Sequence, residues 1–157
     1  MRVIALDPGG TTGVAIMSTD SNDTSPADTN WKFLELKGAH HWDLWQLLER
    51  EDPHYLIYER FQYQRRELDK GVSLSLASVE YIGVLHLWLS SKEKRGSPVY
   101  DICQTPAQAK NLWTDDKLLK VGLYTTGSAH IRDATRHLLY WLTVTQGHRK
   151  WFEILKG

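Results

Sequence analysis

The chain has 157 residues, with 19 basic and 19 acidic side chains and one cysteine, Cys103. This length is expected to form a single domain, residues 1–157, whose core needs no disulfide, and the lone thiol suits a reducing cytoplasm. No apolar run approaches the ~20 residues that span a bilayer, which excludes a transmembrane helix. The zero net charge counts mildly against a nucleic-acid partner, unless basic residues cluster locally or a metal ion adds positive charge.

Apolar periodicity and turn residues predict the elements of the first part of the chain. The strand that follows the first helix should lie parallel to the first strand, because a helical crossover connects parallel neighbours. In chain order the predicted elements are a buried strand at 2–7, its hairpin partner at 12–17, a polar loop at 18–30 that we expect to be mobile, a strand at 31–36, a helix at 41–51 and a strand at 55–59.

The second part begins with a loop at 60–71 that is rich in arginine and aromatic residues, followed by a long helix over 72–89. Two thirds of this helix is apolar, which is too much for one core-facing stripe, so we expect burial by the sheet on one side and by a second subunit on the other. The remaining predictions are a strand at 97–102, a short helix from Pro106, a helical piece at 115–121, a helix at 128–145 and a basic, aromatic tail.

The resulting order, β-β-β-α-β-α-β-α, begins with an antiparallel meander and continues with parallel strands. It resembles the ribonuclease H-like arrangement, an α/β fold in which a mixed five-stranded sheet carries helices on both faces.

Two acidic residues close apolar strands, Asp7 after residues 3–6 and Glu59 after residues 55–58. A carboxylate at the end of a buried strand is costly unless a cation or a donor compensates it. Asp7 also precedes Pro-Gly-Gly, so a simple turn or a phosphate-cradling loop of the sugar-kinase and actin-like kind remain alternatives. That second class needs two such domains and a much longer chain. A metal-ligand role for Asp7 and Glu59 is the favoured interpretation.

Further candidates lie on the last long helix, where His130 and Asp133 are three residues apart and share one face. We interpret both as ligands or proton-transfer groups. The alternatives are that Asp133 only complements the helix dipole and that the position of His130 is incidental. His137, one turn further, is interpreted as a packing residue. Asp115 and Asp116 are interpreted as the start of a helix.

Three carboxylates that meet in space repel one another, and a divalent metal is the simplest remedy. An oxygen-rich site with one imidazole suits Mg²⁺ or Mn²⁺, and a pair of such ions activates water and stabilises the leaving oxygen in phosphodiester hydrolysis. The sequence therefore predicts a site of Asp7, Glu59, His130 and Asp133 with two Mg²⁺ or Mn²⁺ ions.

The chain resembles the RuvC-type Holliday junction resolvases, and more closely their bacteriophage-encoded branch. Four motifs carry the resemblance and together span nearly the whole chain. They are Ile4-Ala5-Leu6-Asp7-Pro8-Gly9, Leu56-Ile57-Tyr58-Glu59, Thr105-Pro106-Ala107-Gln108-Ala109-Lys110 and His130-Ile131-Arg132-Asp133-Ala134-Thr135-Arg136-His137.

The resemblance implies a cytoplasmic enzyme of a bacterium or a phage-infected cell, a homodimer through helix 72–89 that binds four-way DNA junctions and nicks two strands of like polarity symmetrically. In the family an aromatic residue after the glutamate wedges into the junction centre. Here Gln62 stands at the expected place, between Phe61 and Tyr63. The further residues implied to contact DNA are Arg65, Arg66, Lys110 and Lys117.

Three other functions remain open. One is a nuclease of the same fold that cuts flaps or forks. Another is the RuvX/YqgF-like group associated with ribosomal RNA maturation, whose members are shorter and lack the long apolar helix. The last is a junction-binding protein without catalysis, against which the intact quartet of Asp7, Glu59, His130 and Asp133 argues.

Overall fold

The computed structural model describes residues 1–20, 24–38, 41–61 and 76–156. Its centre is a five-stranded mixed sheet in the order β3-β2-β1-β4-β5. In chain order the elements are β1 (Arg2–Asp7), β2 (Thr11–Ser18), the 3₁₀ helix η1 (Pro26–Asp28), β3 (Asn30–Lys37), α1 (His41–Glu51), β4 (Tyr55–Glu59), α3 (Ala77–Lys94), β5 (Tyr100–Gln104), α4 (Pro106–Leu112), α5 (Asp115–Lys120), α6 (Ala129–Tyr140), the π-helix η2 (Trp141–Thr145) and α7 (Lys150–Glu153).

The predicted strand directions are confirmed. β1, β2 and β3 form an antiparallel meander, and β4 lies parallel to β1 and to β5. The helix α1 makes the crossover from the meander to β4, which explains the parallel pairing of β4 with β1.

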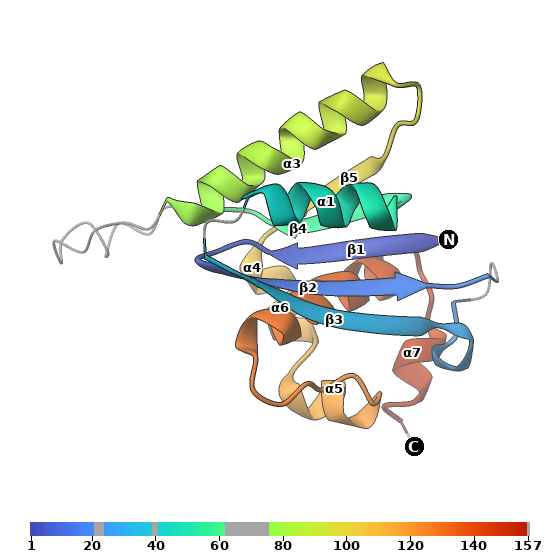
Figure 1. The fold of residues 1–157 in the computed structure, drawn as a ribbon. Helices are drawn as coiled ribbons and strands as arrows, with labels where there is room; N and C mark the ends of the chain where they lie inside the picture. Colours follow the sequence, from blue (N-terminus) through green and yellow to red (C-terminus); the bar gives the residue numbers. More distant parts are fainter. Residues whose placement is uncertain (21–23, 39–40, 62–75, 157) are drawn as a thin grey trace, which may run out of the picture.

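Helices cover the sheet on both faces, with α1 and α3 on one side and α4 to α7 on the other (Figure 1). Successive side chains along β1 point to opposite faces of the sheet and so contribute to the cores on both faces. Val3 and Ala5 join the core beneath α6, whereas Ile4 and Leu6 join the core beneath α1 and α3. Among the described residues, no helix is both long and apolar enough to cross a bilayer.

Two predicted elements have the wrong bounds. The described part of the long helix starts at Ala77 and continues to Lys94, beyond the predicted end at residue 89. Gly96, with φ of 73°, ends it, and the amide of Ser97 reaches back to the carbonyl of Lys92 at 3.0 Å. The fifth strand accordingly begins at Tyr100 and ends at Gln104, two residues past the predicted end at 102.

The described residues of the segment 18–30 pack against the rest of the domain. Thr19 and Thr24 are buried, and the Trp151 indole donates to the carbonyl oxygen of Thr24 at 2.7 Å. Trp151 itself is buried in the core beneath α6, so the basic, aromatic tail is part of the fold. The described part of this segment is therefore packed at Thr19 and Thr24, and its mobility stays a prediction.

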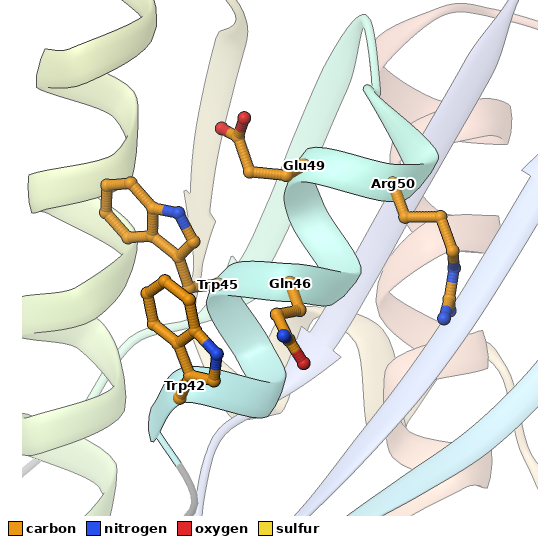
Figure 2. Close-up of a pocket in the computed structure, with 5 residues that line it drawn as sticks. All are labelled: Trp42, Trp45, Gln46, Glu49 and Arg50. Atoms are coloured by element: carbon orange, nitrogen blue, oxygen red, sulfur yellow. The ribbon is translucent and has the colours of Figure 1, made fainter.

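Trp42, Trp45 and Leu48 follow helical spacing, which predicts that they share the buried stripe of α1. The stripe that α1 buries in the structure is shifted from these residues. Leu44, Leu47 and Leu48 are buried, whereas Trp42 is 64% exposed. The rings of Trp42 and Trp45 stack at 6.4 Å with an interplanar angle of 5°. Both indoles lie on the side of α1 that faces α3, and Arg50 points away from them (Figure 2).

Candidate active site

Five residues lie side by side in one row across the sheet. Asp7 pairs with Gly13, Gly13 pairs with Glu35, and Glu59 pairs with Gln104. The pairing of β1 with β4 places Asp7 and Glu59 next to each other at the carboxyl ends of two parallel strands. The next residues on the same face of each strand pack into the core beneath α6, so the whole row faces α6. They are Ala5, Phe33, Ile57 and Ile102, each two positions earlier, and Ala15, two positions later in the antiparallel β2.

The N-terminus of α6 lies directly against this row. A Cβ atom on Gly13 would stand 2.1 Å from the carbonyl carbon and oxygen of His130, so only glycine permits this approach. Ser128 caps the helix by accepting the amide of Ile131 at 3.1 Å, and its hydroxyl donates to Glu35. The first turn of α6 is thereby fixed over β2 and β3.

His130 and Asp7 form the first contact of the candidate site. The Nδ1 atom of His130 lies 2.9 Å from Oδ2 of Asp7, whose side chain is 11% exposed. Burial raises the pKa of Asp7 above its ordinary value, the hydrogen bond with His130 opposes this rise, and the negative charges of Glu59 and Asp133 add to it. The three carboxylates are therefore close enough to repel one another.

Asp133 is held between two basic side chains. Its Oδ2 atom lies 2.9 Å from Nζ of Lys110, and its Oδ1 atom is paired with Arg136. Arg136 also pairs with Asp115 and donates from Nε to the carbonyl oxygen of Trp113 at 2.8 Å. Arg136 therefore ties Asp133 to the start of α5.

The ammonium group of Lys110 lies between two carboxylates, at 2.9 Å from Asp133 and 3.6 Å from Oε2 of Glu59. Burial on its own lowers the pKa of Lys110, but the hydrogen bond and charge of Asp133 and the charges of Glu59 and Asp7 outweigh it and raise that pKa. Lys110 is therefore a fixed positive charge within the carboxylate cluster.

Glu59 contacts a buried histidine. The Nε2 atom of His137 lies 2.9 Å from Oε2 of Glu59, and its Nδ1 atom lies 2.8 Å from Oε1 of Gln104. The interpretation of His137 as a packing residue is correct in that its ring is fully buried. That interpretation misses the contact with Glu59.

The structure thus brings Asp7, Glu59, His130 and Asp133 to one edge of the sheet, together with Lys110. Their catalytic and ligand roles stay predictions.

Lys117, the other lysine assigned to DNA contact, donates to the carbonyl oxygen of Leu112 at 2.6 Å. Phe61 follows the end of β4 and is half-buried. The predicted DNA contacts Tyr63, Arg65 and Arg66 lie outside the described residues.

Sequence reasoning missed Gly13, Gln104 and the link from Arg136 to Asp115. A signal existed for His137, because it lies four residues after Asp133 and so faces the same edge of α6. Gln104 was hidden by the misplaced end of β5. The interpretation of Asp115 as a helix start is correct, since α5 begins there, but its carboxylate also holds Arg136.

Carboxylates dominate the side chains at this edge of the sheet. Within the described part of the chain, no three His, Cys, Asp or Glu side chains converge closely enough to enclose a metal ion. However, three mutually repelling carboxylates gather around one ammonium group, and carboxylate oxygens are the ligands that Mg²⁺ and Mn²⁺ prefer. The donor chemistry fits a divalent cation, and Lys110 supplies the positive charge in this structure.

Comparisons with known proteins identify the fold. No protein-family model and no curated protein sequence matches the chain. Among solved structures, Thermus thermophilus RuvC in complex with a Holliday junction substrate is 19% identical, with a TM-score of 0.60 over 94% of this chain and 97% of that chain.

Two further solved structures are similar. The fowlpox virus resolvase in complex with Holliday junction DNA is 13% identical, with a TM-score of 0.61 over 90% of this chain and 99% of that chain. The yeast mitochondrial Holliday junction resolvase is 16% identical, with a TM-score of 0.51 over 98% of this chain and 80% of that chain. The predicted α/β class and sheet are confirmed: the chain has a ribonuclease H-like fold of the form found in these resolvases.

Proposed function

We propose that the protein is a metal-dependent endonuclease that resolves four-way DNA junctions by paired symmetric nicks. The observation that carries the proposal is the meeting of Asp7, Glu59 and Asp133 around Lys110 at one edge of the sheet. Two of the solved structures with the same fold contain Holliday junction DNA, which supports branched DNA as the substrate class. From its motifs we place the protein in the bacteriophage-like branch and in the cytoplasm of a bacterium or a phage-infected cell.

The residues proposed to hold Mg²⁺ or Mn²⁺ are Asp7, Glu59, His130 and Asp133. Two such ions, when bound, lower the pKa of attacking water and stabilise the charge on the leaving oxygen. The protein's own contribution is to fix the donors: His130 hydrogen-bonds to Asp7, and Lys110 neutralises part of the charge of Glu59 and Asp133.

The proposed DNA contacts surround this edge. Lys110 is 40% exposed, so its ammonium group is accessible to a phosphate while it pairs with Asp133. The further residues proposed to bind DNA are Phe61 or Tyr63 as a base-stacking wedge, and Arg65, Arg66 and Lys117 as phosphate contacts.

Dimerisation through α3 is proposed from the residues that this helix leaves exposed. Tyr81, Leu85 and Trp88 are buried against the sheet layer, whereas Val79, Gly83 and Leu87 form an exposed stripe on α3. Leu87 also lines an apolar groove between α3 and α1, whose other lining residues are His41, Trp42, Trp45 and Val84. A second copy that packs its own α3 on this stripe would bury it, and a two-fold axis would place two active sites on one junction.

The test is cleavage of a labelled synthetic four-way junction in Mg²⁺ and in Mn²⁺, beside matched duplex, flap and fork substrates. We expect paired nicks at symmetric positions on the junction. Asp7→Asn should abolish cutting and still bind the junction, because it removes a donor charge without changing the side-chain shape. Equal cutting of flaps and forks would replace the proposal with a broader branch nuclease. Binding without metal-dependent cutting of any substrate would leave a junction-binding protein.

A further inference from the structure

Behind the carboxylate cluster lies a buried chain of polar side chains from three elements. His137 on α6 is fully buried, and Gln104 at the end of β5 is 3% exposed. The imidazole bridges them to the site, with Nε2 at 2.9 Å from Glu59 and Nδ1 at 2.8 Å from the side-chain amide of Gln104. Both ring nitrogens are therefore engaged, which fixes the orientation of the ring.

The acceptors in this chain determine where the hydrogen atoms lie. A carboxylate only accepts, so Nε2 of His137 must donate to Glu59. In a neutral ring Nδ1 then carries a lone pair and needs a donor. Gln104 has one to offer, because its buried amide nitrogen has no hydrogen-bond partner within the described part of the chain. In the structure the amide oxygen of Gln104 faces Nδ1, and a half-turn of the amide brings the nitrogen there instead. This gives Nδ1 a donor and the amide nitrogen an acceptor, and it moves the oxygen to the position that the nitrogen leaves.

We propose that Gln104 and His137 are positioning residues that fix the side chain of Glu59 at the metal edge through an ordered hydrogen-bond chain. Gln104 donates to Nδ1 of His137, and Nε2–H of His137 donates to Oε2 of Glu59. Lys110 contacts the same oxygen from the exposed side at 3.6 Å, so Glu59 is held between a buried donor and an accessible cation. The inference rests on the proposed function in that it gives Glu59 a ligand role.

This arrangement depends on the position of β5. Glu59 and Gln104 are paired residues on adjacent parallel strands, and the amide of Arg60 donates to the carbonyl oxygen of Gln104 at 2.7 Å. The ends of β4 and β5 are thereby locked together beneath α6. A donor placed behind a ligating carboxylate restricts its rotamers, and loss of such a partner typically costs about 10–100-fold in metal affinity or activity.

The first experiment determines the hydrogen positions without any metal. The full chain, labelled with ¹⁵N at histidine, is studied by long-range ¹H–¹⁵N correlation in EDTA, and His137 is assigned by the loss of its signals in His137→Gln. We expect the neutral tautomer with the hydrogen on Nε2, and we expect Gln104→Met to change the Nδ1 shift. A ring with its only hydrogen on Nδ1, or a doubly protonated ring, would overturn the proposed chain.

The second experiment compares variants in Mn²⁺ calorimetry, junction binding and junction cleavage. His137→Gln keeps a terminal N–H near the position of Nε2, so it should retain most of the Mn²⁺ affinity. Gln104→Met and His137→Leu should lose about 10–100-fold in Mn²⁺ affinity and cleavage, with junction binding unchanged. Thermal unfolding identifies any variant that does not fold, and Gln104→Met is the decisive one if His137→Leu is unfolded.

The outcomes separate the inference from the proposed function. If the wild-type protein cuts junctions and folded Gln104→Met has unchanged Mn²⁺ affinity and cleavage, the positioning role is overturned and the nuclease stands. If the wild-type protein neither binds Mn²⁺ nor cuts junctions, the proposed function is wrong, and so is the ligand role of Glu59. The tautomer measurement still decides whether the hydrogen-bond chain exists.

Discussion

The backbone of His130 lies against Gly13 so closely that no Cβ atom fits between them. Gly13 is also the residue that pairs with Asp7 across β1 and β2. One position without a side chain therefore brings the first turn of α6 down onto the sheet, beside the carboxylate that His130 contacts at 2.9 Å.

Gly13→Ala should damage both stability and activity. The added methyl group would stand 2.1 Å from the backbone of His130, so α6 must move away from Asp7. Overpacking of this kind costs about 1–3 kcal/mol, which denaturant unfolding can measure. The matched control is Gly83→Ala, measured at concentrations below the proposed dimerisation, because nothing in the same chain lies within 4 Å of the new methyl group. A small gain in helix stability is expected there. Equal stability of Gly13→Ala and the wild type would contradict the close approach.

Asp7→Asn should stabilise the protein in EDTA while it removes activity. Burial raises the pKa of Asp7, so the folded protein holds this proton more tightly than the unfolded chain does. The stability of the wild type therefore decreases as pH rises from about 4 through the raised pKa. Asp7→Asn has no carboxyl group to titrate at this position, so it should have the higher melting temperature at neutral pH. Its melting temperature should also change less with pH over the acid range. A lower melting temperature at neutral pH would indicate a structural role in the turn.

Lys110→Gln should make the protein more dependent on divalent ions. Its ammonium group compensates Glu59 and Asp133, so its removal leaves the carboxylates to repel one another. We expect a lower melting temperature in EDTA and a larger increase on addition of Mn²⁺ than in the wild type. Lys117→Gln is the control, because Lys117 hydrogen-bonds to a main-chain oxygen. Its increase in melting temperature on addition of Mn²⁺ should match that of the wild type. Identical increases in melting temperature on addition of Mn²⁺ in the two variants would argue against Lys110 as the compensating cation.

Leu87→Glu should convert the proposed dimer into a monomer. Leu87 is 64% exposed on α3, so the change leaves the core intact. Near a two-fold axis it would bring like charges together, which should weaken self-association at least ~100-fold. Sedimentation or light scattering at several concentrations measures this. Leu119→Glu is the control, since Leu119 is similarly exposed at 57% on α5. A monomeric wild type, or a dimer that survives Leu87→Glu, would remove α3 as the interface.

The sequence predicted those features that depend on local patterns. Asp7 and Glu59 end apolar runs, so their place at one edge of the sheet followed from strand order alone. The parallel pairing of β4 with β1 followed in the same way from the helix before it.

The features of the fold and the site that the sequence did not predict depend on contacts between distant segments. The end of β5 is set by its register against Glu59, which no local pattern reveals, and Gln104 was overlooked with it. Gly13 looks like an ordinary strand residue until α6 is placed on it. Trp42 follows the helical spacing of a buried stripe, but Leu44 and Leu47 occupy the core and leave the indole outside.

The contact between His130 and Asp7 joins residues that are 123 positions apart. Contacts of such long range form late in folding, because the chain must close a large loop before they are gained. β1 and β2 can pair early as a hairpin, but Asp7 meets its partners only when α6 has docked on Gly13. A nascent or partly folded chain would therefore carry Asp7 and Glu59 without a complete site, and the proposed nuclease activity would arise only with the finished domain.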